Sequence, residues 1–208
     1  MTTHSARAAA GPQLAALGLV RALLGGVLAK QGLEQAVDQA QGPVREALTY
    51  QSRWAAQADL RTEVAPVACA LARTAVAALA ISQDGGPAAV ENWLAAQART
   101  VQEHRADLAI ERPADSVVLA AAAVFAEELR QPKGADRAAA AGEREQRATA
   151  LMLEWARPGG NTRDHIELLL AGGWLASQML AYAFAFEEDR ITSYIDDHAR
   201  ELIAAGRR

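Results

Sequence analysis

The chain has 208 residues, of which 51% are hydrophobic, 22% charged and 5% aromatic, with a formal net charge of −4. This balance excludes intrinsic disorder, because half of the residues are apolar and the net charge is small. Mild acidity argues against nucleic-acid binding, and abundant alanine, a strong helix former that is depleted in strands, argues against a β-rich fold. We therefore expect an all-α protein with no nucleic-acid partner.

The first segment, residues 1–12, lacks the basic start and apolar run of a secretory signal. We expect these residues to form a flexible N-terminus and residues 13–208 to form a single α-helical domain. The single cysteine, Cys69, lies in an apolar run and is expected to be buried. It has no partner for an intramolecular disulfide, so we expect a cytoplasmic protein, and the preference for arginine over lysine suggests a high-GC bacterial source.

Glycine and proline mark the ends of a series of helices. The expected helices are, in chain order, 13–40, 44–81 with a break near Pro66, a third that follows Pro87 and runs to about Leu108, a fourth that reaches Arg130, 135–156, a sixth from Thr162, and 191–205. Thr162 and either Asp115 or Ser116 are the expected N-terminal caps. Short connections between these segments predict a single compact bundle of about six to eight helices.

One segment, 168–186, contains no charged residue. A helix of this length would span roughly 28 Å, close to the thickness of a bilayer core, so a membrane span is one alternative. Three acidic residues, at 187–189, follow directly and no positive flank is present. We therefore favour a central helix buried inside the bundle and expect no membrane partner.

Motifs of the common enzyme families are missing from the sequence. It contains no glycine-rich phosphate loop, no dinucleotide-binding turn, no G-x-S-x-G nucleophile motif and no cysteine pair for zinc. We therefore predict no cofactor, and a protein that is more readily a binding protein than an enzyme.

Three histidines fall on or beside apolar helical stripes. His104 lies on a stripe that Gln97 interrupts, His165 begins the long apolar helix, and His198 is in register with isoleucines. We expect them to be core or boundary residues with hydrogen-bond partners. The alternative is a metal site in which His104, His165, His198 and Glu201 converge. The usual Glu-x-x-His pair is absent, since His198 precedes Glu201, so we treat metal binding as the less favoured interpretation.

The tryptophans, at positions 54, 93, 155 and 174, are expected to fill the core. Aromatic residues are densest near the C-terminus. The candidates there for a ligand-pocket wall or a subunit interface are Trp174, Gln178, Tyr182 and Phe186.

The short segment Val27–Glu34 resembles the end of the first helix of TetR-type repressors. The resemblance covers fewer than ten residues, and that family would continue with a helix-turn-helix. Residues 35–43 do not show this pattern, so we do not assign the chain to the family.

Three functional hypotheses follow from the sequence. The first is a non-enzymatic interaction or regulatory protein that forms a homodimer through a helix face. The second is a helical bundle that binds a small apolar ligand. The third is a metal-dependent enzyme that uses histidine and carboxylate ligands in the bundle core.

Overall fold

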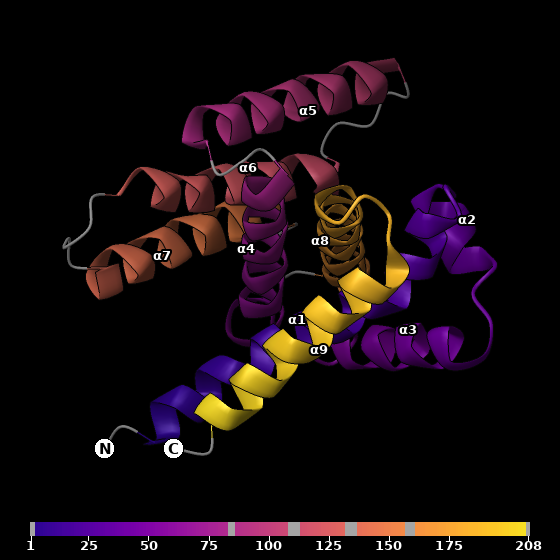
Figure 1. Ribbon diagram of the computed structural model, residues 1–208, viewed down its shortest axis with the longest axis horizontal. Coiled ribbons are helices and arrows are strands. Elements are labelled where there is room, and N and C mark those ends of the chain that lie inside the picture. The colour runs from indigo at the N-terminus through magenta and orange to yellow at the C-terminus, as the bar shows by residue number, and fades with distance from the viewer. Residues whose placement is uncertain (1–2, 83–85, 108–112, 132–136, 157–160, 207–208) are drawn as a thin grey trace.

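The computed structural model describes residues 3–82, 86–107, 113–131, 137–156 and 161–206, and every regular element in these ranges is a helix (Figure 1). The α-helices are α1 (Thr3–Leu28), α2 (Leu33–Asp38), α3 (Gly42–Ala55), α4 (Ala65–Ser82), α5 (Pro87–Asp107), α6 (Ala114–Ala126), α7 (Arg137–Trp155), α8 (Thr162–Ala183) and α9 (Glu188–Ala205). A π-helical turn, η1 (Leu60–Val64), precedes α4, and a 3-10 turn, η2 (Glu127–Arg130), follows α6. The predicted all-α bundle is confirmed.

The N-terminal region differs from the prediction in two ways. α1 begins at Thr3, well before the expected start at residue 13. It ends at Leu28, where we predicted a continuous helix to Ala40, because Lys30 adopts a left-handed backbone conformation with φ of 55°. The amide of Gln31 then donates to the carbonyl of Gly26 (3.0 Å), which is the Schellman pattern that closes a helix. The short α2 follows, so two helices joined by the four residues 29–32 lie where we predicted one continuous helix.

Other helix ends follow the predicted signals with small shifts. The break in the predicted helix 44–81 lies at residues 56–59, before the predicted position near Pro66. η1 continues directly into α4, so Pro66 lies inside one helical stretch and follows its π-helical turn. The cap of α8 is Asn161 and not Thr162, since the Asn161 side chain accepts a hydrogen bond from the amide of Asp164 (3.0 Å). α6 begins after Pro113 without a side-chain cap, and Asp115 lies in its first turn.

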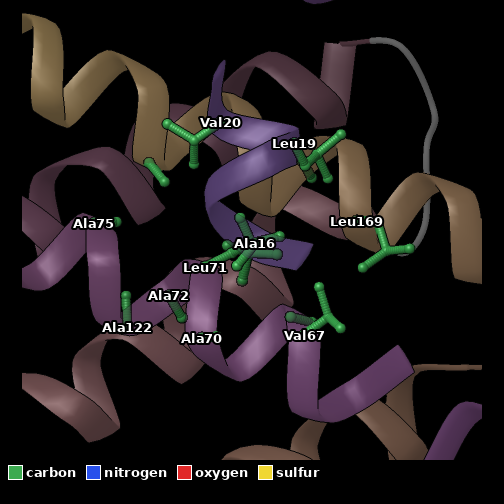
Figure 2. Packing of buried hydrophobic residues seen from close by; sticks show 14 of the residues in the cluster. Ala16, Leu19, Val20, Val67, Ala70, Leu71, Ala72, Ala75, Ala122 and Leu169 are labelled. Carbon is green, nitrogen blue, oxygen red and sulfur yellow. The ribbon is translucent and has the colours of Figure 1, made fainter. Parts of the chain in front are cut away.

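The centre of the bundle is formed by α8 with α4 and α1 (Figure 1). Two adjacent glycines of α8 permit this packing. A Cβ at Gly173 would lie 2.9 Å from side-chain atoms of both Leu19 and Leu23 of α1, and one at Gly172 would lie 3.2 Å from Leu71 of α4. Figure 2 shows how Leu19, Leu71 and neighbouring alanines fill this region. Small side chains therefore bring the two neighbouring helices close to α8 on separate faces.

The remaining helices surround this centre. α6 packs on α4, α7 covers α6, α9 lies along α1, and α5 rests chiefly on α6 (Figure 1). Arg21 of α1 pairs with Asp196 of α9, and Arg147 of α7 forms two 2.7 Å hydrogen bonds to Glu127 beside α6. Ion pairs at the rim thus fasten the outer helices to their neighbours.

Three helical stretches are long and apolar enough to cross a membrane by length and composition. They are Gly11–Leu28, Leu60–Ser82 and Thr162–Ala183. Their most apolar windows are 44%, 67% and 56% buried inside the bundle, respectively. The same helices form the centre of the fold, as expected for 168–186, and the absence of a membrane partner stays a prediction.

Candidate functional site

The structure contains a cavity of about 800 Å³ between α5 and the C-terminal half of α8. The start of α2 borders it on one side, and the end of α4 and the first half of α6 complete the wall. The described lining consists of Gly32, Leu33, Glu34, Leu79, Ser82, Trp93, Gln97, Val101, His104, Asp115, Val118, Leu119, Ala171, Trp174, Leu175, Gln178, Met179 and Tyr182.

One face of α5 forms the outer wall of the cavity. Trp93, Gln97, Val101 and His104 lie four, four and three residues apart, so they share this face. Val90, in contrast, is fully buried within the bundle. The polar Gln97 interrupts the predicted apolar stripe because its face of α5 lines a hollow.

The opposite wall comes from α8. Trp174, Gln178 and Tyr182 recur every four residues and so stand one turn apart, while Leu175 and Met179 add apolar surface beside them. Trp174 is half-buried and Tyr182 is 59% exposed, so the aromatic wall runs from the interior to the mouth of the cavity.

A close approach at Gly26 positions the third wall. A Cβ at Gly26 would overlap the Cβ of Ala36 and would lie 3.4 Å from the Trp174 ring. The glycine therefore lets α2 lie against the end of α1, which brings Leu33 and Glu34 to the edge of the cavity.

Polar side chains lie between the apolar ones around the cavity. Glu34 is exposed, Asp115 is half-buried in the first turn of α6, and the Ser82 hydroxyl donates to the carbonyl of Leu79 (2.9 Å). The side-chain amides of Gln97 and Gln178 face the cavity from opposite helices. This arrangement can hold an apolar molecule and offer it hydrogen bonds from several sides.

Three of the four predicted pocket or interface residues, Trp174, Gln178 and Tyr182, line this cavity. Phe186 does not. α8 ends in a second Schellman pattern, in which the Phe186 amide donates to the Ala181 carbonyl (2.7 Å), and the Phe186 ring stands edge-on against the Tyr182 ring with centroids 5.2 Å apart. Phe186 therefore supports the cavity mouth from outside.

The three histidines do not come together. His104 is exposed at the cavity, so the prediction that it points into the core is wrong. His165 is buried, with Nδ1 3.0 Å from the carbonyl oxygen of Ala55 and with Nε2 lacking a hydrogen-bond partner. The His198 side chain is 43% exposed, so it lies at the boundary between core and solvent. Its Nδ1 atom lies 3.7 Å from Oε2 of Glu201. No three histidine, cysteine or acidic side chains in the described part of the chain are placed to hold a metal ion.

Cys69 is buried on α4, as expected. Burial raises the pKa of its thiol to about 11, and Sγ lies 3.8 Å from the hydroxyl of Thr149. The thiol is therefore an inert packing group at neutral pH.

The tryptophans differ from the expected core fillers. All four are half-buried and pack on the edge of the core, and Trp93 and Trp174 line the cavity.

Comparisons of the chain with protein-family models, with curated proteins and with solved structures give no match.

Proposed function

We propose that this protein binds a small, largely apolar molecule in the cavity between α5 and α8. The observation that carries the proposal is the combination of volume and lining. The cavity measures about 800 Å³, and its lining combines two tryptophans, a tyrosine and several aliphatic side chains with polar groups placed between them. Ligand sites in proteins typically have volumes of about 300–1,000 Å³, and apolar and aromatic side chains with some placed polar groups line them.

Self-association through a helix face, which the sequence favours, remains a separate prediction. The exposed large hydrophobic side chains of the described residues are Val44, Tyr50, Ile81, Tyr182, Phe186 and Ile203. They are distributed over α3, α4, α9 and the end of α8 and so do not form one continuous apolar face. A dimer interface would be expected to use such a face, so we favour the binding cavity as the proposed function. Light scattering during size-exclusion chromatography measures the oligomeric state directly.

The neutral fluorophore N-phenyl-1-naphthylamine tests the proposed binding, because its emission rises in apolar surroundings. We expect saturable binding with one site per chain. The variant Gln97→Trp places a large ring in the cavity and should weaken the binding. Asn92→Trp is the matched control, since Asn92 lies on the same helix, is exposed and does not line the cavity.

The proposal fails if the fluorophore does not bind, or if Gln97→Trp binds it as well as Asn92→Trp does. Circular dichroism and the urea midpoint of both variants show whether α5 remains folded, which separates a filled cavity from a damaged fold.

A further inference from the structure

Two side-chain amides lie on opposite walls of the cavity. Gln97 faces it from α5 and Gln178 faces it from α8, and both side chains are half-buried. Within the residues that the structure describes, neither amide forms a hydrogen bond with another residue. Each amide has an NH₂ group that can donate and a carbonyl oxygen that can accept. Both glutamines can therefore pair with a molecule in the cavity.

Each of these glutamines follows a tryptophan by about one helical turn. Trp93 precedes Gln97 on α5, and Trp174 precedes Gln178 on α8, with a spacing of four residues in both helices. Residues four apart stand on the same face of a helix, so each wall presents an indole ring next to an amide. The two walls thus repeat one combination, which is a broad apolar ring beside a neutral group that both donates and accepts.

The amides restrict which molecules fill this space favourably. A ligand that displaces water from the cavity leaves an amide without a partner unless the ligand itself supplies one, and an unpaired buried amide costs free energy. A pure hydrocarbon would leave both glutamines unpaired. A ketone would leave their carbonyl oxygens without a donor. A molecule that carries a donor and an acceptor side by side can pair with both glutamines at once.

We propose that the cavity selects flat aromatic molecules that have a cyclic amide on one edge. The carbonyl of the ligand accepts a hydrogen bond from one glutamine, and its N–H donates to the other. Trp93 and Trp174 supply apolar surface for the rings of the ligand, since flat aromatic groups stack well on one another. This inference rests on the proposed function and specifies its ligand class.

Phenanthridinone and N-methylphenanthridinone provide the test. Both are flat, three-ring cyclic amides with the same carbonyl, but the methyl group removes the N–H donor. Equilibrium dialysis measures the affinity of each compound for the unmodified protein. We expect phenanthridinone to bind about tenfold more tightly, because its N-methyl derivative leaves one glutamine carbonyl unpaired.

Gln97→Met and Gln178→Met separate this effect from steric hindrance by the methyl group. Methionine has nearly the shape and helix propensity of glutamine but cannot form the hydrogen bonds of an amide. We expect each variant to weaken phenanthridinone binding about fivefold and to change the affinity for N-phenyl-1-naphthylamine less than twofold. Gln102→Met is the matched control, since Gln102 is exposed on α5 and does not line the cavity. It should alter neither affinity.

The outcomes separate the ligand class from the proposed function. Equal binding of the two cyclic amides overturns the inference, and so does a preference for phenanthridinone that persists in both cavity variants, since it would then be steric. A loss in only one of them overturns recognition from both walls. In each case, binding of N-phenyl-1-naphthylamine preserves the proposed function. If this probe and both cyclic amides fail to bind, the proposed function is overturned as well.

Discussion

α8 takes part in two regions of opposite character. Along Gly172 and Gly173 it lies so close to α4 and α1 that an added Cβ would crowd leucines of both helices. Along Trp174, Gln178 and Tyr182 the same helix faces a cavity of about 800 Å³. Adjacent residues of one helix thus separate a closely packed face from a face that lines a cavity.

The difference follows from side-chain size. Alanine and glycine fill little space, so helices that present them must approach closely to exclude voids. α5 is held by α6 and does not approach α8 in this way, and the two tryptophans on the facing walls cover the gap only in part. The contrast teaches that close packing in this fold is local, and that stability and binding can be assigned to different faces of α8.

The largest expected effect contrasts two leucines of α8 two turns apart. Leu168 is fully buried in the core, whereas Leu175 is half-buried and lines the cavity. Leu168→Ala should lower the free energy of unfolding by about 2–5 kcal/mol, because the close-packed region cannot collapse around the lost atoms. Leu175→Ala enlarges an existing cavity and should lower the free energy of unfolding by clearly less. Urea unfolding measures both.

Equal losses for the two variants would contradict the comparison, since they would show that the cavity wall is packed as tightly as the centre. A change in the slope of the unfolding free energy against urea concentration, in either variant, would instead indicate a loss of two-state unfolding.

A second contrast compares the reactivity of thiols. Burial raises the pKa of Cys69 to about 11, so at pH 8 only about 0.1% of it is thiolate, against about a quarter for an ordinary cysteine. A cysteine introduced by Gln178→Cys in a Cys69→Ala background faces the cavity. We expect iodoacetamide to modify it roughly a hundred times faster than Cys69 of the unmodified chain, as followed by mass spectrometry.

The same pKa shift predicts the dependence on pH. As the pH is raised from 7 to 9, the rate at which iodoacetamide modifies Cys69 should keep increasing, because the pH stays well below the pKa of this thiol. The modification rate of the cysteine at position 178 should begin to level off. Modification of Cys69 at the same rate in the folded protein and in urea would show that α4 is not enclosed.

Much of the fold could be predicted from local signals. Glycine, proline and alanine placed most helices, because these residues act through the backbone of their own segment. The end of α1 could not be predicted in this way, since Lys30 has no intrinsic preference for the left-handed conformation with φ of 55° that it adopts. The packing of α2 against α1, which makes that turn favourable, depends on a contact between Gly26 and Ala36 that is invisible before folding.

The cavity could be predicted from one side only. Aromatic density near the C-terminus indicated Trp174 and Tyr182, because large amphipathic rings mark binding surfaces in any helix. The wall on α5 was missed, although Gln97 within an apolar stripe was its signal. His104 was wrongly expected in the core because periodicity assigns a face to a helix but does not tell whether a neighbour fills the space before it.

A third contrast tests the close approach itself. Gly173→Ala forces a Cβ to within 2.9 Å of Leu19 and Leu23, and the strain of overpacking should destabilise the fold by about 1–3 kcal/mol. Gly142→Ala is the matched control on α7, where nothing lies within 4 Å of the added Cβ. It should stabilise the protein by up to about 1 kcal/mol through helix propensity alone. Stabilisation by both substitutions would mean that α1 and α8 are not in close contact.

The smallest expected effect compares two neighbouring residues, Ser177 and Gln178. The Ser177 hydroxyl is fully buried and lies within hydrogen-bonding distance of the carbonyls of Val20 (3.0 Å) and Gly173 (2.7 Å), so it joins α8 to α1. Ser177→Ala should destabilise by about 0.5–1.5 kcal/mol, the usual net value of one hydrogen bond.

Gln178→Ala removes a side chain that faces open space and introduces a better helix former, so thermal unfolding should show little change or a slight gain in stability. The two variants together decide whether the boundary between the packed and hollow faces of α8 lies between adjacent residues. A loss at position 178 as large as that at position 177 would place the Gln178 amide in a hydrogen-bond network that closes the cavity. Binding of N-phenyl-1-naphthylamine to Gln178→Ala would then measure how much of the recognition depends on that amide.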